Sequence, residues 1–233
     1  MVLTNTSKNF NINLNELEKK IDIKFNNVDI IIASLTHDSF YTKHKYSKFS
    51  NQRLEFIGDR VLSFIISLEL FKSFPNYSAG DLSKHHSYLV SMYVLHEIAE
   101  KLNIREHICH VNNSITKSVL ADCVEALIAA IYIDQGLEKA TEFVLEHWSK
   151  YFAQNLNEIS IIINPKPYIE AFINNNNISS YNYTLLKQEG AENNLTFYIE
   201  LKVGDYDPVY SASNTIKQAE KLAAIEFIKR YMS

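Results

Sequence analysis

The sequence predicts a two-part chain, in which an all-α domain precedes a small α+β domain of order α-β-β-β-α. From residue 14 to about residue 155, apolar residues recur at helical spacing, and no segment alternates as a strand would. After residue 157 the pattern changes to three alternating segments separated by turn residues. The composition, 46% hydrophobic with only five glycines and four prolines, is that of a folded protein. Its 233 residues are enough for a substantial core.

The helices of the first part follow one another along the chain. The periodic runs are LNELEKKI, VDIIIASLTHDSF, RLEFIGDRVLSFIISLELFKSF, DLSKHHSYLVSMYVLHEIAEKLNI and SVLADCVEALIAAIYIDQG. Gly136 is expected to stop the last of these. A final helix, LEKATEFVLEHWSKYFAQNL, carries the only tryptophan, Trp148.

The second part begins after a boundary rich in proline and isoleucine, NEISIIINPKP. PKPYIEAFINN predicts a short helix, and YNYTLLKQEG, LTFYIELKVG and PVYSAS predict three strands. TIKQAEKLAAIEFIKRYM closes the chain as an amphipathic helix. We therefore expect a first domain over 1–156, a linker over 157–163 and a second domain over 164–233.

Charge and cysteine content narrow the functional classes. The net charge is −4 and the pI about 6.1, so a polyanion would have to be bound by local patches or through metal ions. Cys109 and Cys123 suit a reducing compartment better than a disulfide scaffold. The N-terminal residues lack the pattern of a secretory signal, and the apolar runs are too short to span a bilayer. The expected location is the cytoplasm, with no membrane partner.

Two acidic pairs stand on otherwise apolar helical runs. Glu55 and Asp59 lie four positions apart, and Asp122 and Glu125 lie three apart, so each pair shares one helix face. Such pairs are common on solvated faces, but these two runs have few polar residues for another face. Four converging carboxylates would suit Mg²⁺ or Mn²⁺, and such ions activate water and stabilise a leaving oxygen on phosphorus.

The motifs resemble one family throughout. RLEFIGDRVL closely resembles the signature helix of ribonuclease III, and ADCVEALIAAIYIDQG resembles that family's second acidic helix. LEKKIDIKFNNVDIIIASLTHDSF and FPNYSAGDLSKHHSYLVS are similar to its N-terminal helices and to the helix after the signature. NPKPYIEAFI and KQAEKLAA resemble parts of a double-stranded-RNA-binding domain. The resemblance covers nearly the whole chain in the right order.

The resemblance implies a catalytic centre and its chemistry. Glu55, Asp59, Asp122 and Glu125 match the family's metal-binding acids, with Asp59 and Glu125 most directly catalytic. The implied reaction is Mg²⁺-dependent hydrolysis of both strands of duplex RNA, with Mn²⁺ as a substitute, in the processing of precursors such as ribosomal and messenger RNA. The implied products carry 5′-phosphates and short 3′ overhangs. A homodimer is also implied, with Phe56 packed into the partner, although an ordinary core phenylalanine fits the sequence equally well.

The implied RNA contacts are partly altered in this chain. The matching positions are Lys84, His86, Lys166, Lys217 and Lys221. Against the family's usual residues, Gln52 and Ala79 replace glutamates, Arg60 replaces a small residue, and His86 replaces a permanent charge with a titratable one. In the second domain the departures are at Glu170, Ala171, Ala191, Asn193 and Ile216. These changes are expected to affect RNA binding and the choice of cleavage site more than the hydrolysis itself, since none of them falls on the four acids.

Three functions stay open at this point. The first is an active duplex-RNA endonuclease. The second is a non-catalytic subunit of the same fold with a structural or RNA-binding role, against which the four retained acids argue. The third is a nuclease that relies on its catalytic cleft to hold RNA, with a C-terminal domain that mainly serves a protein partner. Residues 164–233 are not globally basic, with seven Lys or Arg against eight Asp or Glu.

Overall fold

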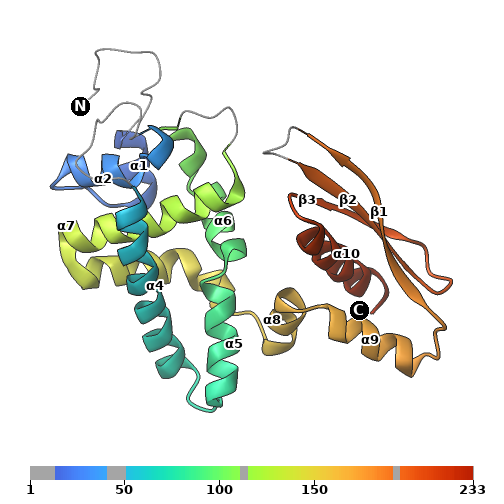
Figure 1. Cartoon of the computed structure of the whole chain (residues 1–233). Coiled ribbons are helices and arrows are strands. Elements are labelled where there is room, and N and C mark those ends of the chain that lie inside the picture. Colours follow the sequence, from blue (N-terminus) through green and yellow to red (C-terminus); the bar gives the residue numbers. More distant parts are fainter. Residues whose placement is uncertain (1–13, 41–50, 111–114, 191–194, 233) are drawn as a thin grey trace. The chain divides into compact units, whose positions relative to one another are not determined.

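The computed structural model describes residues 14–40, 51–110, 115–190 and 195–232, which divide into two compact units, Met1–Gln154 and Asn155–Ser233 (Figure 1). The first unit is helical and the second contains the sheet. This arrangement confirms the predicted fold class. Across the described helices, none combines the length and apolar character needed to cross a membrane.

The described part of the first unit is built from helices. Its elements are α1 (Leu14–Ile21), α2 (Val28–Ser34), α4 (Asn51–Ser73), α5 (Ala79–Leu89), α6 (Met92–Lys101), the short 3₁₀ helix η1 (Ile104–Glu106) and α7 (Lys117–Phe152). Side-chain caps define several starts: Ser78, Ser91 and Thr116 each accept a bond from a backbone N–H of the following first turn. In Figure 1, α4 crosses α7 in the body of this unit.

The two final helices predicted for the first domain both lie within α7, and the backbone leaves the helical conformation between them at Gly136, where the stop was expected. Gly136 has φ 88° and ψ 179°, a backbone conformation that favours glycine. Just before it, the Asp134 carboxylate accepts bonds of 2.9 Å from the backbone N–H groups of Asn26 and Asn27. After it, the buried Trp148 donates from Nε1 to the Leu89 carbonyl at 2.9 Å. These bonds tie both halves of α7 to the rest of the unit.

The backbones of α4 and α7 approach each other closely at Gly58. A Cβ atom at this position would lie 1.8 Å from the backbone carbonyl oxygen of Glu125, which no side chain tolerates. Glycine inside a helix lowers stability by about 1 kcal/mol relative to alanine. Its use here therefore allows the backbones of α4 and α7 to touch, at the level of the two acidic pairs.

The second unit contains six elements. They are α8 (Leu156–Ile163), α9 (Lys166–Asn175), β1 (Tyr181–Glu189), β2 (Thr196–Val203), β3 (Val209–Ser213) and α10 (Ile216–Tyr231). The strands form one antiparallel sheet of order β1-β2-β3. The register between β1 and β2 shifts between Leu185 and Lys187. The order of elements from α9 to α10 is the predicted α-β-β-β-α.

The segment expected to be a linker, 157–163, is helical and forms most of α8. Asn155 caps this helix by accepting a bond from the backbone N–H of Glu158 at 3.0 Å. Ile159 is fully buried and Ile161 packs against the core of the second unit. Apolar residues spaced along LNEISIII therefore give the segment a buried face.

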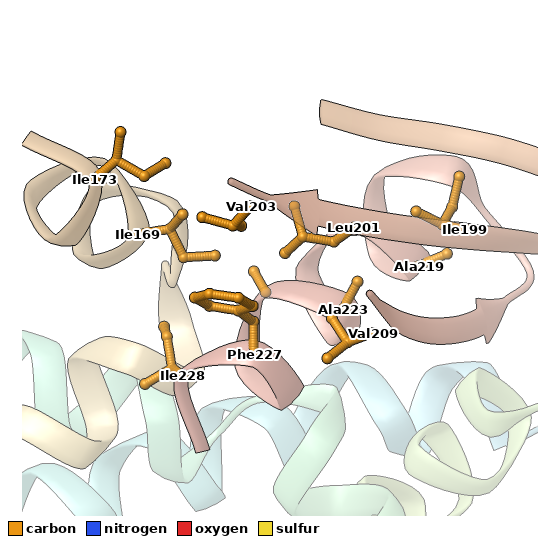
Figure 2. Packing of buried hydrophobic residues seen from close by; sticks show 11 residues of the cluster. Ile169, Ile173, Ile199, Leu201, Val203, Val209, Ala219, Ala223, Phe227 and Ile228 are labelled. Atoms are coloured by element: carbon orange, nitrogen blue, oxygen red, sulfur yellow. The ribbon is translucent and has the colours of Figure 1, made fainter. Parts of the chain in front are cut away.

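The core of the second unit lies between the sheet and its two flanking helices (Figure 2). Ile199, Leu201 and Val203 alternate along β2, so all three point to the same face. Phe227 of α10 and Ile169 of α9 meet them there, and both are fully buried. The opposite face of the sheet carries the intervening polar and aromatic side chains.

We predict that Gly58→Ala destabilises the first unit, because the new methyl group forces α4 away from the Glu125 carbonyl. Overpacking of this kind costs about 1–3 kcal/mol. Urea unfolding followed by fluorescence measures this unit specifically, because Trp148 is the only tryptophan and lies within it.

Gly80→Ala is the matched control. The nearest atom to a Cβ at Gly80 lies 3.7 Å away, in ordinary van der Waals contact. Since Gly80 lies in α5, alanine there should leave stability unchanged or raise it by up to about 1 kcal/mol. Equal losses in the two variants would contradict the close helix crossing.

Candidate active site

Four acids stand on the two crossing helices of the first unit. α4 carries Glu55 and Asp59, one helical turn apart, and α7 carries Asp122 and Glu125 within its first turns. Gly58 lies between the first pair and touches the backbone of Glu125. The backbone contact thus brings the two acidic pairs to the same level of the helix crossing.

Three of the four carboxylates converge. One carboxylate oxygen from each of Glu55, Asp122 and Glu125 lies within 4.8 Å of the other two. All three residues are half-buried. The neighbouring residues Cys123 and Val124 are fully buried, which anchors this part of α7 in the core. The three acids therefore form a cluster that is held by the fold but open on one side.

The fourth predicted acid, Asp59, points its carboxylate to a different partner. Its Oδ2 accepts a bond of 2.9 Å from Nη1 of Arg60. The same Arg60 nitrogen donates to the Phe56 carbonyl at 2.9 Å, and the guanidinium carbon lies 3.8 Å from the centre of the Phe56 ring. Asp59 is thus near the group of three but not a member of it.

Burial and mutual repulsion disfavour the charged form of the clustered acids. Burial raises the pKa of Glu125, and the charges of Asp59, Glu55 and Asp122 raise it further, to about 8. Burial, then Asp122 and Asp59, raise the pKa of Glu55. Burial also raises the pKa of Asp122. A bound divalent cation would reverse this effect, because it stabilises the charged carboxylates.

The residues fit a hard divalent cation. Glu55, Asp122 and Glu125 offer only oxygen atoms, and oxygen-only ligation suits Mg²⁺ or Mn²⁺. Three carboxylates on rigid helices leave further coordination positions for water or substrate, as Mg²⁺ sites generally do. The charge balance also fits, since the charged form of these carboxylates is disfavoured without a cation.

The two predicted RNA contacts on α5 differ in their environment. Lys84 is exposed. His86 is half-buried, with Nε2 at 2.9 Å from the Ser63 hydroxyl and 3.3 Å from the Ser63 carbonyl on α4. His86 lies in a shallow pocket lined also by Ser67, Leu70, Ala79, Leu82 and Ser83. The imidazole is therefore engaged within the unit, whereas Lys84 is directed to solvent.

The predicted lysine contacts of the second unit also separate into two kinds. Lys166 is paired with Glu220 at 2.6 Å, and its ammonium lies 5.0 Å from the centre of the Tyr183 ring. Lys217 is exposed and Lys221 is half-buried, and the two lie one turn apart on α10. Burial, with a contribution from Lys217, lowers the pKa of Lys221. Ala191 and Asn193 lie outside the described residues.

Sequence patterns did not identify the partners of these side chains. Ser63 contacts His86, and Glu220 pairs with Lys166. In each pair the two residues lie far apart in the sequence, so helical or strand periodicity does not predict the contact. The sequence did single out Arg60, because the family usually has a small residue at this position. Its contact with Asp59 shows what that substitution does in the structure.

Two families of known proteins match the chain. The family described as Ribonuclease-III-like matches residues 27–151. The double-stranded RNA binding motif matches residues 165–231. Together the two matches cover both structural units.

Similar proteins match over nearly the whole chain. Ribonuclease 3 of Clostridium acetobutylicum is 34% identical over 222 residues, covering 93% of this chain and 96% of that protein. Ribonuclease 3 of Rickettsia conorii is 32% identical over 223 residues, covering 92% and 96%. A structure of the nuclease domain of ribonuclease III from Campylobacter jejuni, described by its flexibility in a region involved in dimer formation, superposes with a TM-score of 0.55 at 32% identity. It covers 61% of this chain and 100% of that one.

Proposed function

The chain belongs to the ribonuclease III family, and from this premise we propose that it is a metal-dependent endonuclease that cuts both strands of duplex RNA. The match to the Ribonuclease-III-like family over residues 27–151 establishes the membership, together with relatives of similar length. The predicted family, enzyme class and C-terminal RNA-binding motif are confirmed by these matches.

One observation carries the proposed chemistry: the convergence of Glu55, Asp122 and Glu125 within 4.8 Å. These three residues would hold Mg²⁺, or Mn²⁺ in its place. When bound, such an ion supplies an activated water and stabilises charge on the phosphate oxygens. The helices contribute orientation, because α4 and α7 fix the carboxylates from opposite sides of one crossing. We assign the direct catalytic roles to Glu125 and to Asp59, which lies one turn from Glu55.

The finer features of the proposal follow from the family. We infer products with 5′-phosphates and short 3′ overhangs, and structured precursors such as ribosomal RNA as substrates. We also infer a cytoplasmic location, which the two buried free thiols of Cys109 and Cys123 suit. A non-catalytic role is the weaker reading, since three acids converge although burial and their mutual repulsion disfavour the charged form of Glu125.

We further propose a homodimer formed through an apolar stripe on α4. Phe56, Phe64, Leu68 and Phe71 are all exposed, with Phe71 71% exposed. Their spacing places them along one side of the helix. A monomer rarely exposes four large apolar side chains on one side of a helix, so a second copy is the expected partner. The similarity to a nuclease domain with a described dimer-forming region supports the same assignment.

We expect Glu125→Gln to lower the rate of duplex-RNA cleavage in Mg²⁺ by about a hundredfold or more, the scale on which one group that stabilises transition-state charge acts. Glutamine keeps the volume but removes the charge that holds the ion. RNA affinity measured in EDTA should not change. Glu138→Gln, at an exposed position later on α7, is the control and should cut at the wild-type rate. Near-normal cleavage by the Glu125 variant would exclude this site as the catalytic centre.

For the dimer, sedimentation at micromolar concentration should show a species of about twice the 26.9 kDa chain mass. Phe64→Glu should shift it to the monomer, because a buried unpaired charge at the interface is strongly unfavourable. Val28→Glu, an equivalent change at an exposed position on α2, should remain dimeric. A wild-type protein that sediments only as a monomer would refute the proposed interface.

The lysines of the second unit should contribute unequally to RNA binding. Lys217→Ala should weaken binding to duplex RNA and reduce the salt dependence by about one phosphate contact. Lys166→Ala should have a smaller effect, because Glu220 already neutralises that ammonium. Titrations of the full chain in EDTA over a range of salt concentrations compare the two matched variants. A larger loss for Lys166→Ala would mean that RNA displaces Glu220 and uses Lys166 directly.

A further inference from the structure

Arg60 makes three contacts around the catalytic acids that nothing in the proposed chemistry requires. Its Nη1 bridges the Asp59 carboxylate and the Phe56 carbonyl, both at 2.9 Å. Its guanidinium plane covers the Phe56 ring at 3.8 Å. Arginine is well suited to such a position because its planar group can stack and donate several bonds at once.

The contact with Arg60 determines where the Asp59 carboxylate lies. The carboxylates of Glu55, Asp122 and Glu125 converge, while the Asp59 carboxylate is bonded to Arg60 and stays outside that group. The Asp59 charge still raises the pKa of Glu55 and Glu125, so Asp59 is close to the cluster. In the orientation in which it accepts the bond from Arg60, the Asp59 carboxylate lies outside the group, so it would have to turn away from Arg60 to share a cation with the other three acids.

We propose that Arg60 is a positioning residue that competes with the divalent metal for Asp59 and holds it apart from the other three acids until the metal binds. This inference rests on the proposed metal-dependent nuclease. Arg60 would act as a reversible latch, which sets the metal concentration at which all four acids assemble.

The strength of the contact suits a latch that opens. The side chains of Arg60 and Asp59 are 58% and 47% exposed, so water competes for both. An exposed ion pair of this kind changes an equilibrium constant by no more than about fivefold. A divalent ion held by three further carboxylates can therefore displace it, but the pair still biases the free protein.

The Phe56 ring gives the latch a defined resting position. Stacking and the bond to the Phe56 carbonyl together orient the guanidinium toward Asp59, since Phe56 lies one turn before Arg60 on α4. A lysine at this position would keep the charge but lose the planar stacking surface and the fork of donors. Arg60→Lys therefore separates the effect of geometry from that of charge.

The test is a double-mutant cycle on Mg²⁺ affinity, measured by calorimetric titration of the full chain without RNA. The four proteins are the wild type, Arg60→Ala, Asp59→Asn and the double variant. Arg60→Ala should bind Mg²⁺ about two- to fivefold more tightly than the wild type, on the scale of the pair it removes. In the Asp59→Asn background the same substitution should give no gain, because the ion pair between residues 59 and 60 is already removed.

The outcomes separate the latch from simpler effects. An equal gain in both backgrounds would show that Arg60 acts by long-range charge on the cluster and would overturn the latch. An Arg60→Lys affinity equal to that of the wild type would overturn the geometric part in the same way, whereas a partial gain supports it. An unchanged or weaker affinity in Arg60→Ala would also refute the proposal.

The proposed function fails in a different way. If the wild type neither binds Mg²⁺ at the cluster nor cuts duplex RNA, the nuclease assignment itself is wrong and the latch falls with it. If the wild type binds Mg²⁺ and cuts RNA while the Arg60 variants bind as it does, only the latch is wrong.

Discussion

The backbone contact between Gly58 of α4 and Glu125 of α7 is the constraint on which the active site depends. With space for no Cβ atom, the two helices approach until a carbonyl oxygen fills the position of a side chain. This crossing brings Glu55 of one helix to Asp122 and Glu125 of the other. A wider crossing would leave the same acids on two separate faces, each solvated and unable to share a cation.

The same closeness makes the free site electrostatically unfavourable. Burial and like charge raise the pKa of Glu125 to about 8. The charged cluster therefore needs positive charge nearby, and the side chains of the protein provide only part of it. Arg60 supplies part of this charge, because it lowers the pKa of Glu125 while it pairs with Asp59 at the edge of the cluster. The fold thus holds three carboxylates close enough to repel one another when charged, and a divalent ion would relieve this repulsion. Metal binding is therefore coupled to the loss of protons from the site.

Local patterns in the sequence predicted the fold class and the acid pairs, because helical and strand periodicity and i, i+3 or i, i+4 spacing are properties of neighbouring residues. The site residues themselves stay a proposal. Periodicity could not show that Asp59 turns to Arg60, that Ser63 engages His86, or that Glu220 pairs with Lys166. These outcomes depend on side-chain choices and on residues distant in sequence. The prolines that mark the predicted boundary, Pro165 and Pro167, follow α8, and the isoleucines of α8 itself give one buried face to a helix.

The central claim is that Glu55, Asp122 and Glu125 together hold one divalent cation. A crystal structure of the protein grown with Mn²⁺, with data collected for anomalous scattering by manganese, tests it most directly. The account predicts an anomalous peak at about 2.0–2.3 Å from an oxygen of each of the three acids, the distance range of hard-cation ligation. A saturated crystal with no peak at the crossing of α4 and α7, or with manganese bound away from these residues, would contradict it.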